Sequence, residues 1–268
     1  MEDILKKKLV LLLIVTFSTL FYHPAYAIVG GTVAKQEERS YFARIHVGNY
    51  LCGGSLISDQ WVLTAAHCLV DENGERRPDD SIRAFLGDPN RSRLDGTEQV
   101  RMVLISFVHP DYNNETIAND IALLYLNKPV KITDAVGVIP LFDGDVEVGA
   151  TATISGFGDI DENETAPKSL MTGDITIAND NDCIGTYWDY SPESNLCGEE
   201  SVVDACYGDS GGPLVIDDKL AGVISYGLGC GKNPGVYVDA SYYNDWIKGT
   251  IVNHLSSDMV VFVPLIVR

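Results

Sequence analysis

Short apolar segments separated by turn-forming residues constrain the fold of this chain more than any other feature of its sequence. Clusters of Gly, Asn, Asp and Pro, which favour turns, lie between these segments. Regularly spaced short strands are typical of an all-β sandwich or barrel. The expected strands cover residues 43–47, 61–64, 100–108, 121–126, 150–154, 214–216, 220–226 and 235–238.

One segment after these strands has a helical pattern instead. In residues 240–252, apolar side chains recur at the spacing of one helix face, at Tyr243, Trp246, Ile247 and Ile251. The turn-rich residues 131–149 are expected to link two β units. With 268 residues, the chain is long enough for one large domain or two small ones.

The first 27 residues have the features of a cleaved export signal. Three lysines at positions 6–8 precede an apolar run over 9–21, and Ala25-Tyr26-Ala27 forms a small-x-small cleavage site. The apolar run is too short to span a bilayer comfortably. We therefore expect a secreted protein without a stable membrane span; an uncleaved anchor is the alternative.

The chain that remains is strongly acidic. Without the three lysines and two acidic residues of the signal, it has 16 basic and 36 acidic residues, a formal net charge of −20. A protein of this charge is not expected to bind nucleic acid. This negative charge either favours the binding of basic substrates or belongs to an acidic surface that is simply solvated.

All six cysteines lie after the export signal. An even number of cysteines in an exported chain indicates disulfides, and six cysteines allow 15 connectivities. The sequence has no C-x2-C pair, so the cysteine spacing does not indicate a zinc site.

Three segments carry the residue types of a nucleophilic catalyst. "WVLTAAHC" contains His67, "NDIALLYL" contains Asp120, and "ACYGDSGGPLV" contains Ser210 in a Gly-rich turn. A serine hydroxyl needs a base to take its proton, and the base needs a carboxylate to fix its tautomer. Taken singly, each residue has a structural explanation, as a turn serine, a strand-end aspartate or a structural histidine.

Together these segments resemble the chymotrypsin–trypsin family of serine proteases. The resemblance extends from Ile28 to about His254 and rests on "IVGGT", "CGGSLIS", "WVLTAAHC", "DIALL", "GDSGGPLV" and "NPGVYVDA". It implies two antiparallel β-barrels with the active site in the cleft between them, plus a C-terminal helix. The expected divisions are a signal peptide at 1–27, the first barrel at 28–139, the second barrel with the helix at 140–255, and an apolar tail of unassigned role at 256–268.

The resemblance also implies roles for individual residues. His67, Asp120 and Ser210 would form the catalytic triad, and the backbone N–H groups of Gly208 and Ser210 would form the oxyanion hole. The implied disulfides are Cys52–Cys68, Cys183–Cys197 and Cys206–Cys230.

Family members place their specificity residue six positions before the serine, and here that residue is Asp204. A carboxylate at the base of a pocket would favour a substrate with Arg or Lys at P1, the residue before the scissile bond. Gly227 and Gly235 match two pocket-wall positions. Ala205 replaces a common Ser, which favours Arg over Lys, and Tyr226 replaces a common Trp.

The resemblance further implies that a free amino group at Ile28 pairs with Asp209. Most relatives have Arg or Lys before this Ile as an activation site, but this chain has Ala27. We hypothesise that signal peptidase cuts between Ala27 and Ile28 and releases active enzyme directly. The rival is a cut after Ala25, followed by removal of the dipeptide.

No cofactor is expected to be required, but a structural calcium ion is a candidate ligand. The loop 87–99 resembles the calcium loop of trypsins. Its candidate ligands are the carboxylates of Asp88, Asp95 and Glu98 and the backbone carbonyls of Asn90 and Arg93. An unliganded surface loop is the alternative.

The expected partners are protein or peptide substrates and protein inhibitors of proteases, and the protein is expected to be a monomer. Two rival functions remain. One is a catalytically silent relative that serves as a binding module. The other is an enzyme that prefers small or aromatic P1 residues, against which Asp204 argues.

Overall fold

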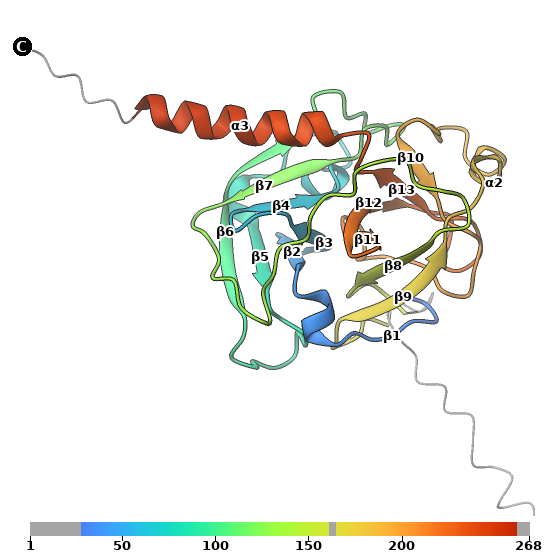
Figure 1. Cartoon of the computed structure of the whole chain (residues 1–268), viewed down its shortest axis with the longest axis horizontal. Helices are drawn as coiled ribbons and strands as arrows, with labels where there is room; N and C mark the ends of the chain where they lie inside the picture. The colour runs from blue at the N-terminus through green and yellow to red at the C-terminus, as the bar shows by residue number, and fades with distance from the viewer. Residues whose placement is uncertain (1–27, 161–164, 262–268) are drawn as a thin grey trace, which may run out of the picture.

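A computed structural model of the chain describes residues 28–160 and 165–261. Six antiparallel strands from the first half form a closed barrel in the order β2-β3-β4-β7-β6-β5 (Figure 1). Their bounds are β2 Phe42–Val47, β3 Tyr50–Leu56, β4 Trp61–Thr64, β5 Ile82–Leu86, β6 Gln99–Val108 and β7 Ala122–Leu126.

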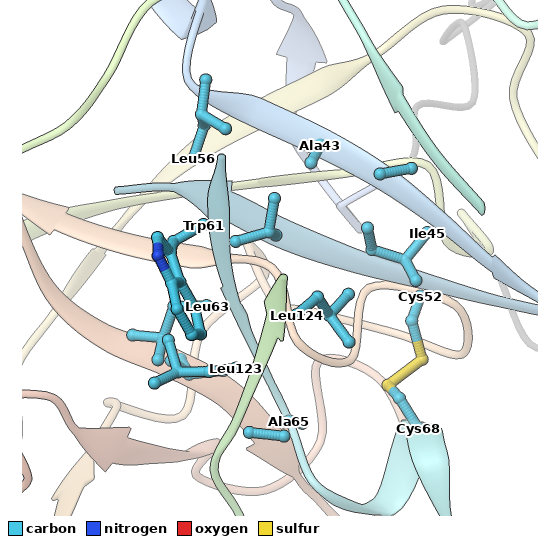
Figure 2. Packing of buried hydrophobic residues seen from close by; sticks show 14 of the residues in the cluster. Ala43, Ile45, Cys52, Leu56, Trp61, Leu63, Ala65, Cys68, Leu123 and Leu124 are labelled. Carbon is cyan, nitrogen blue, oxygen red and sulfur yellow. A yellow bond between two sulfur atoms is a disulfide. The ribbon is translucent and has the colours of Figure 1, made fainter. Parts of the chain in front are cut away.

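Alternating apolar side chains fill this barrel. Along β2, Ala43, Ile45 and Val47 all point into the core, as expected for side chains two residues apart on a strand. Figure 2 shows Ile45 and Leu124 packed beside the disulfide between Cys52 and Cys68. The barrel core therefore reaches the disulfide that borders the candidate site.

The second half forms a seven-stranded sheet in the order β1-β9-β8-β11-β12-β13-β10. Its strands are β1 Thr32–Val33, β8 Thr151–Gly156, β9 Met171–Thr176, β10 Asn195–Cys197, β11 Pro213–Ile216, β12 Lys219–Tyr226 and β13 Val236–Asp239. The chain before β2 therefore adds β1 to the sheet of the second half.

This sheet is not a closed barrel, so the prediction of two barrels is wrong for the second half. Its edge strands are β1, which has two residues, and β10, which has three. Beyond β9 and β10, one isolated bridge joins Ile177 to Gly198. Strands this short do not provide a continuous ladder that would close the sheet.

Two α-helices lie within the described residues, α2 Asp180–Ile184 and α3 Asn244–Val261, together with the short 3-10 helices Gln36–Arg39, His67–Leu69 and Asp79–Ser81. Helix α3 lies along the first barrel and extends beyond it (Figure 1). The helix begins at Asn244, four residues after the predicted start at 240. Ile247 in the helix and Tyr243 just before it are buried in the same apolar cluster as the barrel core. Within the described residues, none of the helices combines the length and apolar character needed to cross a bilayer.

Candidate active site

His67 and Asp120 lie next to each other at one end of the first barrel. His67 begins a 3-10 helix just after β4, and Asp120 precedes β7, which pairs with β4. The Nδ1 atom of His67 lies 2.7 Å from Asp120 Oδ2, and the backbone N–H of His67 donates to Oδ1 at 2.8 Å. This double contact fixes the imidazole plane and directs the Nδ1 proton to the carboxylate, which leaves Nε2 as the basic nitrogen.

The Asp120 carboxylate is almost completely buried and depends on these contacts for its charge. Ser225, on β12 of the second sheet, also donates to Oδ2, at 2.5 Å. Burial acts to raise the pKa of Asp120, but the nearby His67 charge and hydrogen bonds from His67 and Ser225 keep it below its ordinary value. Burial acts to lower the pKa of His67, but the Asp120 charge and hydrogen bond raise it above its ordinary value.

Ser210 comes from the second half of the chain and meets His67 at the Cys52–Cys68 disulfide. Its backbone oxygen accepts a hydrogen bond from the N–H of Gly53 in β3, at 2.7 Å. The Sγ atom of Cys68 lies 3.7 Å from that oxygen and 3.9 Å from His67 Nε2. The structure therefore brings the three predicted triad residues to one place, where the barrel and the sheet meet.

Gly208, a residue of the predicted oxyanion hole, has a backbone conformation that favours glycine. Its φ is +97°, a value that L side chains rarely adopt. A Cβ at Gly208 would also lie 3.0 Å from the Cα of Gly158. Both observations favour glycine at position 208, in the turn that leads to Ser210.

The three disulfides implied by the family resemblance are present. Cys52 pairs with Cys68, Cys183 with Cys197, and Cys206 with Cys230. Both Cys206 and Cys230 line the cavity beside Ser210, so the third disulfide holds two walls of that cavity together.

A cavity of about 190 Å³ opens beside Ser210 and has Asp204 in its lining. Four other residues of the predicted pocket also line it: Ala205, Tyr226, Gly227 and Gly235. Asp204 is 7% exposed, and its Oδ2 accepts a hydrogen bond from the N–H of Gly231 at 2.7 Å. Burial raises the pKa of Asp204 to about 6. A cation that entered this cavity would meet a carboxylate that has lost most of its water.

The predicted activation pair lies behind this cavity. Ile28 is fully buried, and Val29 exchanges two backbone hydrogen bonds with Asp204, at 2.9 and 3.1 Å. Asp209 is also fully buried and accepts hydrogen bonds from the N–H groups of Gly158 and Cys206, at 2.7 and 2.9 Å. Burial raises the pKa of Asp209 to about 7. The export signal itself lies outside the described residues.

The three carboxylates among the candidate calcium ligands have other partners in the structure. Asp88 pairs with Arg44, Asp95 pairs with Arg93 at 2.8 Å, and Glu98 accepts backbone N–H groups of its own loop. In the part of the chain that the structure describes, no three of the loop carboxylates form a cluster of possible metal ligands. These carboxylates make other contacts in the structure, and calcium binding stays a prediction.

Another cluster, Cys52, His67 and Cys68, has metal-ligand spacing. Its two cysteines are joined to each other, so neither has a thiolate to offer a metal.

Sequence reasoning missed two residues that hold this site together. One is Ser225, which directly precedes the predicted pocket residue Tyr226. The other is Tyr187, whose hydroxyl donates to Pro234 O at 2.5 Å and accepts from the N–H of Leu228 at 3.1 Å. Tyr187 thereby connects the two segments that flank the Cys230 side of the cavity. Neither residue has a signal in the sequence beyond its position between motif residues.

Comparison with known proteins agrees with this geometry. A family model described as Trypsin matches residues 28–247. Over 232 residues the chain is 38% identical to mast cell protease 3 of Ovis aries, and the match covers 84% of this chain and 89% of that protein. It is 35% identical to a trypsin of Xenopus laevis over 229 residues, with 84% and 90% covered. It is 36% identical to duodenase-1 of Bos taurus over 232 residues, with 84% and 89% covered.

Proposed function

Because the chain belongs to the trypsin family of serine endopeptidases, we propose that it cleaves proteins and peptides after arginine, and less readily after lysine. Family membership leaves this preference open, since the relatives include a mast cell protease and a duodenase besides trypsins. The observation that carries the proposal is the buried Asp204 carboxylate in the cavity beside Ser210.

The proposed chemistry is acyl transfer through Ser210. Nε2 of His67 takes the Ser210 proton as the hydroxyl oxygen bonds to the substrate carbonyl carbon. The backbone N–H groups of Gly208 and Ser210 stabilise the negative oxygen that forms, and one such donor contributes about 3–4 kcal/mol in the transition state. His67 then protonates the leaving amine as the peptide bond breaks, and water releases the acyl group by the same steps in reverse order.

The preference for arginine over lysine follows from what surrounds Asp204. Its neighbour Ala205 has no hydroxyl with which to hold an ammonium group, whereas a guanidinium can bind the carboxylate through two parallel hydrogen bonds. Glycine at 227 and 235 leaves room for the long side chain. Asp204 also argues against small or aromatic P1 residues, because such residues would leave the buried charge without a partner.

The test is to compare kcat/KM for matched arginine and lysine amides. We expect the arginine substrate to be cleaved roughly tenfold faster, a difference of about 1.4 kcal/mol. Asp204→Ser should abolish the preference. Equal values for arginine and lysine in the unaltered protein would refute the proposal.

We also propose that the protein is secreted and that signal peptidase produces the active N-terminus at Ile28. Complete burial of Ile28 and Asp209 supports a paired ammonium and carboxylate there, since a lone buried charge is strongly destabilising. A cut after Ala25 would require a second peptidase.

The rival reading is a catalytically silent relative. A serine-reactive fluorophosphonate probe separates the two, because an enzyme is labelled at Ser210 and a silent protein is not. The close contact between His67 and Asp120 supports the enzyme.

A further inference from the structure

We propose that Arg77 and Tyr50 form a subsite that selects an acidic side chain at the second residue after the scissile bond. The proposal rests on the endopeptidase activity proposed above and adds a preference on the leaving-group side. Together with Asp204, it would make the enzyme selective for a basic residue before the bond and an acidic one soon after it.

The leaving group of this reaction passes over the Cys52–Cys68 disulfide. Its nitrogen takes a proton from His67 Nε2, and Cys68 Sγ lies 3.9 Å from that atom. The P1 side chain enters the cavity that contains Asp204, and neither Cys52 nor Cys68 lines that cavity. Residues after the scissile bond must therefore extend away from the cavity, across the disulfide.

Tyr50 lies on the same strand face as Cys52. Side chains two residues apart share a face and lie about 7 Å apart. Their partners on β2 agree, because Val47 opposite Tyr50 and Ile45 opposite Cys52 are both core residues of the barrel. Tyr50 begins β3 at the rim of the barrel and is 58% exposed. An extended substrate advances about 3.3 Å per residue, so its second leaving-group residue reaches Tyr50.

Arg77 is held over the ring of Tyr50, with its guanidinium carbon 3.9 Å from the ring centroid. A hairpin over residues 69–77 brings it there. The N–H of Arg77 donates to Leu69 O at 2.8 Å, and Val70 pairs with Arg76. Because Leu69 ends the 3-10 helix that begins at His67, the hairpin is anchored to the proposed catalytic base.

The charge of Arg77 is available to a substrate. Within the described ranges, no carboxylate forms an ion pair with Arg77. The carboxylate of Asp71, in the same hairpin, accepts hydrogen bonds from the N–H groups of Glu75 and Asn73. These bonds, with a smaller contribution from the Arg77 charge, lower the pKa of Asp71. Arg76 differs, since it donates to Ser106 O at 2.8 Å and lies 3.9 Å from Asp79. In a protein of strongly negative charge, Arg77 is a local binding point for a carboxylate.

The test uses internally quenched peptides that share one sequence up to a P1 arginine and carry Asp, Ala or Lys at the second position after the bond. An exposed charge contact changes affinity by a few fold. We therefore expect the Asp peptide to be cleaved about tenfold better than the Lys peptide in kcat/KM. The ratio should fall in 0.5 M salt, since salt screens exposed charges.

Two variants at position 77 and one matched control complete the experiment. Arg77→Gln should bring the Asp-to-Lys ratio close to one, and Arg77→Lys should keep much of it. Arg76→Gln should leave the ratio and the overall rate unchanged. A merely structural role for Arg77 would slow all three peptides equally and leave the ratio intact, which would overturn the proposal.

Failure of the subsite and failure of the proposed function give different results. An enzyme that cleaves all three peptides after arginine at equal rates, or that prefers Lys, overturns the subsite alone. A protein that cleaves none of them overturns the proposed function and, with it, the subsite.

Discussion

The carboxylate of Asp204 and the Cα of Gly235 approach so closely that a Cβ on Gly235 would lie 3.3 Å from Asp204 Oδ1. The same Cβ would lie 2.9 Å from the hydroxyl oxygen of Tyr237. On the other wall, a Cβ on Gly227 would have its nearest neighbours 3.9 Å away, which is ordinary contact. The two glycines therefore differ in how much space they leave for a substrate.

Alanine substitutions at these glycines should have unequal effects. Gly235→Ala displaces the carboxylate that receives the substrate cation, so we expect kcat/KM for an arginine amide to fall about 100-fold. Gly227→Ala narrows the entrance without touching Asp204 and should cost less than tenfold. Steady-state kinetics of both variants measures the difference, and equal losses would contradict this account of the cavity.

Replacing Asp204 with asparagine should stabilise the fold while it abolishes cleavage after arginine. Burial raises the pKa of Asp204 from its ordinary value of 3.8 to about 6. A carboxyl with a raised pKa destabilises the fold when ionised, so the penalty is absent below pH 3.8 and complete above pH 6. Asp204→Asn should therefore add roughly 2–3 kcal/mol to the free energy of unfolding at pH 7.

Urea unfolding at pH 7 and pH 4 checks this prediction. The difference in free energy between the two proteins should nearly vanish at pH 4. An equal difference at both values would show that the carboxyl charge is not its source.

The pH dependence of kcat/KM should depend on the Asp120–His67 pair. Cleavage needs neutral His67, whose pKa is raised by Asp120, so activity should rise with pH through a midpoint above 6.5. Asp120→Asn removes the charge that raises this pKa and should shift the midpoint to lower pH, with kcat lower by about 10⁴. Because Asp204 titrates in both proteins, a shift between them belongs to His67. An unchanged midpoint would contradict the pairing.

The N-terminus of the secreted protein should be Ile28. Mass spectrometry of the mature chain tests this directly, and any other first residue counts against cleavage by signal peptidase alone. A protein made with one extra alanine before Ile28 should lose most of its activity, because its ammonium can no longer reach the buried Asp209. Full activity in that protein would refute the pairing.

The sequence predicted many of the strands that bury apolar side chains, but it missed β3, β5 and β9. The strands β4, β7, β11 and β12 follow the expected ranges within two residues. Strand β3 was missed because Gly53 and Gly54 interrupt its apolar pattern. A Cβ on Gly53 would lie 2.6 Å from the Cα of Gly212, so this glycine serves a close approach between the barrel and the loop of Ser210. Such an approach joins residues far apart in the chain and leaves no local pattern.

The sequence also could not predict that the second sheet stays open. Whether a sheet closes depends on the length and register of its edge strands, and neither β1 nor β10 was expected at all. Helix α3 extends to Val261, beyond the predicted end at residue 252. The sequence did not predict these last turns because they have no regular apolar face. The motifs around His67, Asp120 and Ser210, in contrast, could be recognised in the sequence because each is a short continuous segment.

The hydrogen bond from Gly53 N–H to Ser210 O joins the peptide of the proposed nucleophile to a strand of the opposite half. Any hinged opening of the two halves would have to break this hydrogen bond. We therefore expect the choice among protein substrates to depend on the exposed loops around the site, so that changes in those loops can alter it without changing the groups that carry out the reaction.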